Sequence, residues 1–305
     1  MIDTLSLYEM LKNVIGDEDR VLRDVPMKEY TTFRAGGNAD LMAVPADEEE
    51  LNGVLEVLHR ENVPYFVLGN GSDVLVRDGG YHGVILHVGK AMSDIRVEGE
   101  RLTAQAGALL SAAASEAAKH SLTGMEFASG IPGSIGGAVF MDAGAYDGEM
   151  KMIVESVRAL MPDGTVRSFS GEELDFSYRH SVFMENEAVI LSAVLKLEKG
   201  DRAAIDAKMK DLNQRRVSKQ PLEKASAGST FKRPEGYFAG KLIDDAGCRG
   251  LSVGAAQVSP KHAGFIVNNG GATASDILDL IALVQMKVKE DFGVELHPEV
   301  RIIGD

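Results

Sequence analysis

Apolar and polar positions in the first third of the chain follow helix and strand periodicities in turn. Residues 46–62 carry a helical stripe, with Asp47 placed as its N-cap. The stripe has the spacing i, i+3, i+4 and i+7 and consists of Leu51, Val54, Leu55 and Leu58. Short apolar runs at 39–45 and 63–76 flank this helix, and residues 1–16 form an amphipathic pattern. The first third is therefore predicted to hold a strand–helix–strand unit preceded by a helix.

From residue 81 the pattern changes to short alternating strands. Ile95 and Val97 alternate with polar residues before a Gly-Glu-Arg turn, and a Pro-Asp-Gly turn divides the apolar runs of residues 154–170. Between these hairpins the small residues of 108–121 predict a helix, and 188–200 predicts a further strand. This part is therefore expected to be dominated by antiparallel strands.

The last part of the chain has the pattern of a separate α+β unit. A charged helix is predicted at 201–221, where Pro221 ends it. After it we expect a short helix, two strands, a long helix and a closing strand, at 238–247, 254–259, 262–269, 274–293 and 295–303. The long helix has Ser275 as its expected N-cap. Its apolar stripe consists of Ile277, Leu280, Ile281, Val284 and Val288.

Composition and charge exclude several classes of function. The chain has 305 residues and a formal net charge of -14, which argues against nucleic acid as a partner because phosphate backbones attract basic surfaces. No apolar run reaches the roughly 20 residues that span a bilayer, and the acidic N-terminus is unlike a signal peptide. The single cysteine, Cys248, fits a reducing compartment. We therefore expect a cytoplasmic protein with no membrane span and no metal site, and the oligomeric state stays open.

Two glycine-bearing loops carry the candidate chemistry. "ASGIPGSIGGAVFMDAGA" at 128–145 lacks the lysine of a P-loop and the glycine spacing of a Rossmann turn, so alone it also fits a purely structural loop. "LGNGSDVLV" at 68–76 is a second polar turn between apolar strands, rich in N–H and hydroxyl donors. Together the two loops suggest one long ligand that carries phosphates.

The motifs "TTFRAGGNAD", "LGNGSDVLV" and "SGIPGSIGGAV", in that order, resemble the FAD-binding domain of the UDP-N-acetylenolpyruvoylglucosamine reductase family. The wider group is the vanillyl-alcohol-oxidase-like (PCMH) flavoproteins. The resemblance implies an α+β fold with two FAD-binding subdomains, at 1–86 and 87–200, and a C-terminal α+β substrate-binding domain at 201–305. It also implies non-covalent FAD along the loops. The residues implied to contact FAD are Arg34, Gly69, Asn70, Gly71, Ser72, Asp73, Ser129, Gly130, Pro132, Gly133, Ser134, Gly136, Gly137 and Ala138.

Three later motifs resemble the catalytic motifs of the same family. "FSYRHSVF" implies that Arg179 lies beside flavin and substrate, "SAGSTFKRP" implies Ser229 as proton donor, and "ELHPEVRIIG" implies Glu299 as a second acid or polarising group. Alone, these residues equally fit a surface ion pair, a turn and a solvated strand edge. The segment around Ser229 has Ala227 and Phe231 where a nucleophile elbow needs glycine, which argues against Ser-His-Asp hydrolysis.

The resemblance further implies an activity and a set of substrate contacts. The activity is NADPH-dependent reduction of UDP-N-acetylglucosamine enolpyruvate to UDP-N-acetylmuramate in peptidoglycan precursor synthesis. The expected substrate contacts are Tyr178, Lys232, Arg233, Lys241, Gln257, Lys261, His262 and Asn268. The stretch 157–197 is too compact for the tyrosine-loop insertion of some members, so the chain resembles the shorter, second type.

Two other functions remain open at this stage. The glycine loops alone also fit a flavin oxidase of the same superfamily, which often carries a covalently linked flavin. A nucleotide-sugar sensor that binds without turnover would need no hydride acceptor. The motifs around Ser229 and Glu299 favour the reductase over the oxidase, and a colourless purified protein would favour the sensor over both enzymes.

Overall fold

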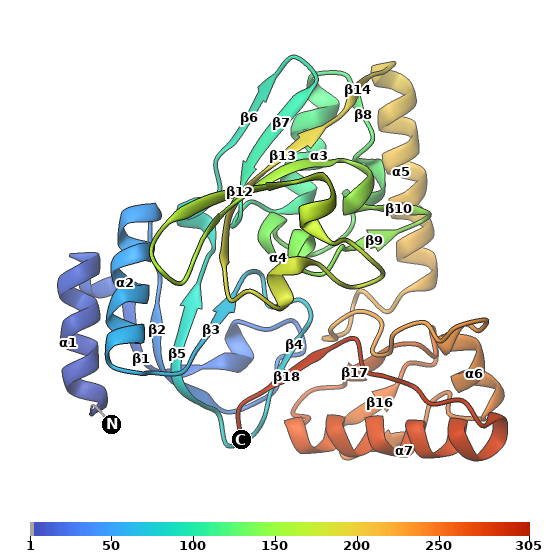
Figure 1. The fold of residues 1–305 in the computed structure, drawn as a ribbon. Coiled ribbons are helices and arrows are strands. Elements are labelled where there is room, and N and C mark those ends of the chain that lie inside the picture. Colours follow the sequence, from blue (N-terminus) through green and yellow to red (C-terminus); the bar gives the residue numbers. More distant parts are fainter. Residues whose placement is uncertain (1–2) are drawn as a thin grey trace. The chain divides into compact units, whose positions relative to one another are not determined.

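The computed structural model of the chain describes residues 3–305, which form two compact units (Figure 1). Unit 1 comprises the described part of 1–23 together with 41–70 and 83–215, and unit 2 comprises 24–40, 71–82 and 216–305. Each unit has its own apolar core. The chain crosses from one unit to the other within three strands, which are β1 (Val21–Pro26), β2 (Asn38–Ala43) and β5 (Tyr81–His87). It also crosses between residues 70 and 71 and between residues 215 and 216.

Unit 1 is built around a five-stranded antiparallel sheet in the order β12-β11-β13-β7-β6. Its strands are β6 (Ile95–Glu98), β7 (Arg101–Gln105), β11 (Val154–Leu160), β12 (Val166–Ser170) and β13 (Val189–Lys196). Both hairpins expected from the sequence are present, β6 with β7 and β11 with β12. Two short pairs complete the antiparallel strands of this unit: β8 (Leu122–Thr123) with β14 (Glu198–Lys199), and β9 (Gly144–Ala145) with β10 (Gly148–Glu149).

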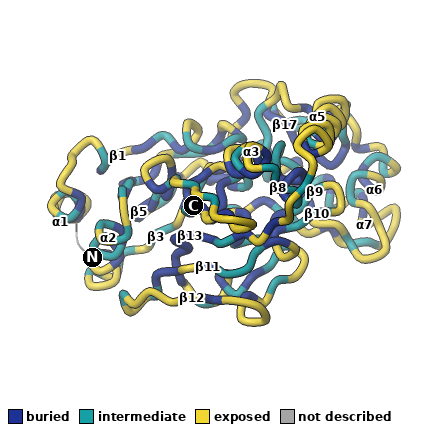
Figure 2. Tube along the Cα trace, turned by 90° about the horizontal axis from the view of Figure 1, so that it is seen from above, coloured by how far each residue is buried: buried dark blue, intermediate teal, exposed yellow. Residues whose placement is uncertain are grey.

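The helices of unit 1 lie where the sequence predicts helices, except α4, which lies within the glycine-rich loop 128–145 and was not predicted. They are α1 (Thr4–Ile15), α2 (Glu48–Arg60), α3 (Leu110–Lys119), α4 (Ile135–Phe140) and most of α5 (Arg202–Lys219). All four residues of the predicted α2 stripe are buried, and the Asp47 side chain accepts the N–H of Glu50, so that the predicted N-cap is confirmed. Helices α1 and α2 lie side by side (Figure 1). In contrast, α5 buries only Ile205 and Leu212 and is largely exposed (Figure 2).

A second sheet has the strand order β1-β2-β5-β3. Strand β3 (Tyr65–Leu68) pairs in parallel with β5, with Tyr65 opposite Val84. The predicted strand–helix–strand unit therefore exists as β2, α2 and β3. However, β5 lies between β2 and β3 in the sheet, a position that local pattern does not reveal.

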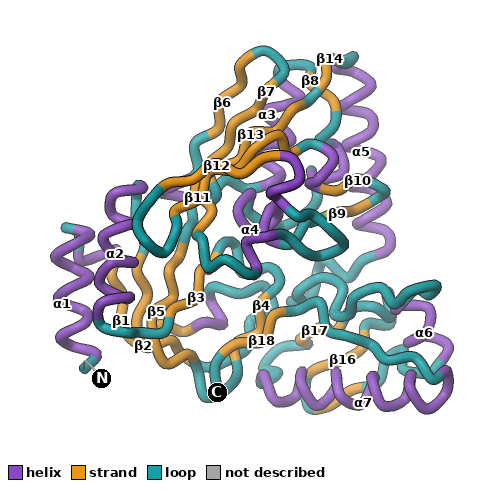
Figure 3. The backbone as a smooth tube through the Cα atoms, viewed as in Figure 1, coloured by secondary structure: helices purple, strands orange, loops and turns teal. Residues whose placement is uncertain are grey.

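Unit 2 contains a three-stranded antiparallel sheet with a long helix against it. The sheet has the order β15-β16-β17, and β4 forms a separate parallel pair with β18 (Figure 3). The elements are β4 (Val74–Val76), α6 (Ala239–Asp245), β15 (Ser252–Val253), β16 (Ala256–Val258), β17 (Ile266–Asn268), α7 (Ala274–Phe292) and β18 (Arg301–Ile303). The whole predicted stripe of α7 is buried in the core of unit 2.

Two local predictions in unit 2 are wrong. The N-cap of α7 is Thr273 and not Ser275: Thr273 accepts the N–H of Asp276, whose carboxylate in turn accepts the N–H of Thr273. Ser275 is already inside the first turn, where its hydroxyl donates to Asp78 at 2.6 Å. The closing strand is regular only at 301–303, because Pro298 has no N–H to donate and forms only an isolated bridge.

Candidate active site

The glycine-rich loop 128–145 is folded tightly onto a neighbouring segment of unit 1. The N–H of Gly136 donates to the carbonyl of Ala106 at 2.8 Å, and a Cβ at Gly136 would lie only 2.9 Å from the Cβ of Ala106. Ser134 is buried and begins α4, where its hydroxyl accepts the N–H of Gly137 at 3.4 Å. Glycine at 136 is therefore required by packing, whereas Gly137 is exposed and has only that hydroxyl near its Cβ position.

The second glycine loop, residues 69–73, meets the first within unit 1. The side-chain amide of Asn70 donates to the carbonyl of Pro132 at 2.6 Å. A Cβ at Gly69 would overlap the hydroxyl of Ser134. The structure thus brings parts of both loops together, which is the arrangement that one ligand lying along both of them requires.

The same loop continues into unit 2, where Gly71 packs against a pair of threonines. Gly71 has φ +60°, a Cβ there would overlap the carbonyl of Tyr30, and its own carbonyl accepts the N–H of Thr32 at 3.0 Å. The hydroxyls of Thr31 and Thr32 are buried and have no hydrogen-bond partner among the described residues. Sequence reasoning missed these two threonines, although they stand in the "TTFRAGG" stretch that carried the resemblance.

Several other residues expected to contact FAD already form hydrogen bonds within the protein. The Ser129 hydroxyl donates to the carbonyl of Glu126 at 2.9 Å. The N–H of Ala138, a buried residue, donates to the carbonyl of Ser134. Arg34 is exposed and adopts a left-handed backbone conformation with φ +53°. Within 130–134, Ile131 already donates its N–H to the carbonyl of Ala128 and Pro132 has no N–H, which leaves Gly130, Gly133 and Ser134 as the candidate backbone donors for a ligand before α4 begins.

Tyr178 and Arg179 form the tip of a tight turn in unit 1. Ser177 and His180 exchange both backbone hydrogen bonds across it, at 3.2 and 3.0 Å. Arg179 has φ +57°, a region that costs a residue with a Cβ roughly 1 kcal/mol or more. Backbone strain of this kind clusters at functional sites, so the turn supports a working role for its tip.

The Arg179 guanidinium is held by backbone carbonyls near the end of the glycine loop. Its Nη1 lies 3.4 Å from the carbonyl oxygen of Asp142 and its Nη2 3.5 Å from that of Gly144. The guanidinium carbon also lies 5.0 Å from the centre of the Tyr178 ring, within the range of a cation–π contact. The arginine is thereby given a defined orientation before any ligand arrives.

Ser229 and Glu299 lie on adjoining antiparallel segments of unit 2. The carbonyl of Thr230 accepts the N–H of Glu299 at 2.8 Å, and the N–H of Lys232 donates to the carbonyl of His297 at 2.8 Å. Thr230 is fully buried and anchors the segment, whereas Ser229 beside it is exposed. The fold therefore brings together two candidate catalytic residues that are 70 positions apart in the sequence.

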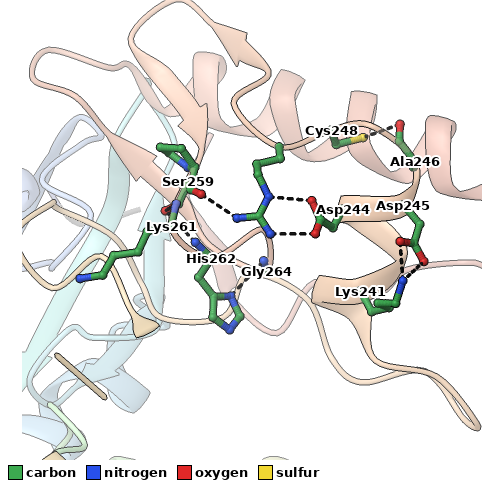
Figure 4. Close-up of polar contacts among 11 residues, drawn as sticks. Lys241, Asp244, Asp245, Ala246, Cys248, Ser259, Lys261, His262 and Gly264 are labelled. Carbon is green, nitrogen blue, oxygen red and sulfur yellow. Dashed lines mark hydrogen bonds and ion pairs between the residues drawn. The ribbon is translucent and has the colours of Figure 1, made fainter. Parts of the chain in front are cut away.

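His262 is fixed in one tautomer. Its Nδ1 accepts the N–H of Gly264 at 3.1 Å, which leaves Nε2 as the protonated nitrogen (Figure 4). The ring packs edge-on against Phe265, with centroids 4.9 Å apart. Burial, aided by the positive charges of Arg249 and Lys219, lowers the pKa of His262 below its usual value. The imidazole is thus a neutral donor that presents an N–H to a ligand.

The remaining expected substrate contacts are mostly engaged within unit 2. Lys241 pairs with Asp245 one turn away (Figure 4), and Lys261 donates to the carbonyl of Val217 at 2.7 Å. Arg233 donates to the carbonyl of Tyr237 at 3.2 Å and lies 4.0 Å from the centre of the Phe238 ring, while Lys232 is exposed.

Two amide side chains hold backbone segments together. Asn268 donates to the carbonyls of Phe33 and Arg34 and accepts the N–H groups of Gly270 and Ala272. Gln257 donates to Gly250 and accepts from Asn269. Both the side-chain amide nitrogen and the side-chain oxygen of Asn268 are therefore hydrogen-bonded within the protein, and the residue is 5% exposed.

Two further classes of site can be addressed in the described part of the chain. Among residues 3–305, no cluster of three or more His, Cys, Asp or Glu side chains is arranged to hold a metal ion. No helix in that range is long and apolar enough to cross a membrane.

Comparison with known proteins gives the family. Residues 220–303 match the family model of the UDP-N-acetylenolpyruvoylglucosamine reductase C-terminal domain, and residues 39–170 match that of the FAD binding domain. The UDP-N-acetylenolpyruvoylglucosamine reductase of Clostridium perfringens (strain SM101 / Type A) is 52% identical over 300 residues, which are 98% of each chain. That of Clostridium novyi (strain NT) is 50% identical over 305 residues, which are 100% of this chain and 99% of its relative.

The chain belongs to the UDP-N-acetylenolpyruvoylglucosamine reductase family. A solved structure agrees: the family member from Thermus caldophilus superimposes with a TM-score of 0.81 at 36% identity and covers 93% of this chain and 99% of its own. The expected α+β fold with an FAD-binding part and a C-terminal domain is confirmed. The length of 305 residues fits the shorter type of this family.

Membership of the reductase family makes the chain an FAD-dependent oxidoreductase of peptidoglycan precursor synthesis that uses NADPH. The residues present fit FAD on two observations. In unit 1 the two glycine loops meet at Asn70 and Pro132. In unit 2 the loop beside Gly71 contains two buried hydroxyls with no partner among the described residues, which a ligand's polar groups would satisfy.

Proposed function

We propose that the chain reduces the enolpyruvyl group of UDP-N-acetylglucosamine enolpyruvate with electrons from NADPH, and that Arg179, Ser229 and Glu299 carry the chemistry. The observation that carries this assignment is the pairing of the segments of Ser229 and Glu299 through the Thr230 carbonyl and the Glu299 N–H, at 2.8 Å. FAD supplies the hydride transfer between NADPH and the substrate. We further propose that residues 1–86 and 87–200 form the two FAD-binding subdomains, that 201–305 binds the substrate, and that the enzyme works in the cytoplasm.

The roles follow from where charge develops. Hydride arrival at the vinyl carbon puts negative charge on the neighbouring carbon and its carboxylate. Arg179 stabilises that charge, since a planar guanidinium matches a carboxylate. A protonated Glu299 would donate a hydrogen bond to the same group. Ser229 then gives its hydroxyl proton to the carbon and regains one from solvent, with the positive charge of Lys232 in the same segment favouring the alkoxide.

Those expected substrate contacts that already form hydrogen bonds or ion pairs within the protein take supporting roles in this proposal. Asn268, Gln257, Lys241 and Lys261 shape the C-terminal domain around the substrate through the contacts given above. Direct contact with the substrate is assigned to Tyr178, Lys232, Arg233 and His262. FAD is assigned to the loop residues at 69–73 and 129–138 and to Arg34, with Thr31 and Thr32 added.

The cofactor assignment predicts that the protein purifies yellow and that acid denaturation releases the flavin as FAD. Gly137→Leu should lower FAD occupancy severalfold, because Gly137 is exposed on the loop and its Cβ position is open. The thermal unfolding temperature of the flavin-free protein should stay within a few degrees of the unaltered chain, since leucine favours a helix more than glycine does. The measurements are the visible spectrum per mole of protein and thermal unfolding.

The matched control is Ala207→Leu, which adds the same side chain at an exposed position of α5. It should retain full flavin content. If Gly137→Leu also retained full flavin content, the start of α4 would not be part of the cofactor site. Gly71 is unsuitable for this test, because a side chain there would overlap the Tyr30 backbone and disturb the fold itself.

The fixed tautomer of His262 predicts which substitution preserves substrate binding. His262→Gln places an amide N–H near the position of Nε2–H, so its KM should rise less than that of His262→Ala, which we expect to rise about tenfold for one lost hydrogen bond. His262→Asn, which restores only the Nδ1-side acceptor for Gly264, should resemble alanine.

The pH dependence of KM provides a second check on the same histidine. Because the pKa of His262 is lowered, the neutral donor persists below the usual titration range, and protonation at still lower pH removes the acceptor that Gly264 uses. KM should therefore stay flat through neutral pH. Equal KM values for the glutamine and asparagine variants would contradict the assignment of Nε2.

A further inference from the structure

Arg249 joins helix α6 to the loop that carries His262. Its Nε and Nη2 donate to the two carboxylate oxygens of Asp244 in α6, at 2.6 and 2.8 Å. Its Nη1 donates to the carbonyl of Pro260 at 2.6 Å. The planar guanidinium therefore holds the carboxylate as a fork and uses its third nitrogen for the carbonyl. All of these groups belong to unit 2.

The loop 259–264 forms a tight turn around one buried serine. Ser259 is 1% exposed, and its hydroxyl accepts the N–H of His262 at 3.2 Å (Figure 4). His262 in turn accepts the N–H of Gly264 at Nδ1. The carbonyl that Arg249 holds stands between Ser259 and His262 in the sequence. A fixed position of this carbonyl therefore fixes the turn that orients the imidazole ring.

The first turn of α6 approaches the same histidine. A Cβ at Gly240 would lie 3.4 Å from Cε1 of His262 and 3.3 Å from the backbone nitrogen of Gly264. Helix α6 is itself anchored in the core of unit 2 by two buried side chains. The helix thus meets the loop at two points, which are its first turn and the carboxylate that holds Arg249.

The ion pair of Arg249 with Asp244 contributes little to the stability of the fold. The two side chains are 41% and 40% exposed, and water screens the attraction between charges at such positions. The buried side chains of α6 hold the helix in place without the pair. The contacts of Arg249 therefore matter more for the position of the loop than for the free energy of unfolding.

We propose that Arg249 is a positioning residue for His262. Its hold on the Pro260 carbonyl keeps the loop in the conformation in which the Nε2–H of His262 faces the substrate. Asp244 fixes the guanidinium in the position that this hold requires. The inference rests on the proposed contact of His262 with the substrate. Because Arg249 acts through the histidine and not on the reacting atoms, its loss should weaken substrate binding without slowing the chemistry.

The first test is a double-mutant cycle with the FAD-loaded enzyme. Arg249→Ala should raise KM for the enolpyruvyl sugar about fivefold, a part of the roughly tenfold expected for the lost hydrogen bond in His262→Ala. Its kcat and its rate of flavin reduction by NADPH should stay within about twofold of the unaltered enzyme. The double variant should have the KM of His262→Ala, because the arginine acts only through that ring.

Two further variants complete the cycle. Arg249→Lys keeps the positive charge but cannot hold the carboxylate and the carbonyl together, so its KM should lie between those of the unaltered enzyme and Arg249→Ala. If Arg249→Ala does not fold, Arg249→Lys takes its place in the cycle. The matched control is Arg202→Ala in α5, which removes an exposed arginine that also donates to a carboxylate, that of Asp206, at 2.6 Å. This control should leave KM unchanged.

The ring of His262 can also be observed without turnover, by nitrogen NMR at about pH 8, where an ordinary imidazole is neutral. The unaltered protein should show one tautomer, with the proton on Nε2. In Arg249→Ala the shifts of the two ring nitrogens should move towards each other, since a loosened loop no longer keeps the Gly264 N–H on Nδ1. The spectrum of His262→Ala identifies the signals among the seven histidines of the chain.

The outcomes distinguish this inference from the proposed function. A raised KM in His262→Ala together with an unchanged KM in Arg249→Ala would overturn the inference and leave the role of His262 intact. KM effects that multiply in the double variant, or a single unchanged tautomer in Arg249→Ala, would overturn it as well. A normal KM in His262→Ala would overturn the contact of His262 with the substrate, and the inference with it.

Discussion

Ser229→Ala is expected to leave flavin reduction by NADPH nearly intact while slowing reoxidation by the enolpyruvyl sugar by about 10²-fold to 10⁴-fold, the range typical of a missing general acid. The proton is needed only after hydride has reached the substrate, so only the second half-reaction should respond. Ser229 is exposed and its neighbour Thr230 carries the structural contacts of the segment, so the substitution should not disturb the fold.

Stopped-flow absorbance measures this directly. The alanine variant should bleach with NADPH at a normal rate and stay bleached when substrate arrives under nitrogen. Ser229→Cys should retain part of the activity, since a thiol also donates a proton. Ser252→Ala, an exposed serine in β15 of the same unit, should behave like the unaltered enzyme. Rapid recovery of the flavin colour in Ser229→Ala would show that another group protonates the substrate.

The helices and hairpins were predictable because their signals are local. The α2 and α7 stripes repeat within a few turns, and each faces one core. The β11–β12 hairpin is specified by the Pro-Asp-Gly turn between its strands. The N-cap of α7 also had a local signal that the prediction missed, since Thr273 and Asp276 have the spacing of a capping box, whereas the residue three positions after Ser275 is Leu278.

Pairings between distant segments were beyond local pattern. Strand β4 pairs in parallel with β18, more than 200 residues later, and β5 enters the sheet between β2 and β3. The predicted closing strand was too long. The alternation of apolar residues at 295–303 continues across Pro298, but a proline has no N–H to donate and interrupts the strand pairing. Such contacts depend on the tertiary fold and leave no periodic signature.

The motifs identified candidate site residues, but the sequence could not predict which contacts those residues make in the fold. The motifs led to Ser229 and Glu299, and the fold then set their backbones side by side. Asn268 was expected to contact the substrate, and the structure shows that its side chain is buried and hydrogen-bonded to other chain segments.

Arg179→Ala is expected to lower turnover by about 10²-fold to 10³-fold, the loss typical when a donor that stabilises developing negative charge is removed. Substrate binding should change far less, because the charge appears on the substrate only during hydride transfer. Arg179→Lys keeps the positive charge but cannot reach the Asp142 and Gly144 carbonyls as a planar fork, so it should recover only part of the loss.

The control for the arginine is Arg167→Ala in β12. Arg167 also makes a cation–π contact, 4.4 Å from the Phe169 ring centre, and pairs with Glu173 at 2.7 Å, but it lies outside the candidate site. Its loss should cost at most about 1 kcal/mol of stability and no turnover. Steady-state kcat and KM for the enolpyruvyl sugar, with the rate of flavin reoxidation, provide the comparison. If Arg179→Ala turns over like Arg167→Ala, the strained turn at 177–180 orients Tyr178 alone, and the charge that develops on the substrate is stabilised by Glu299 without the guanidinium.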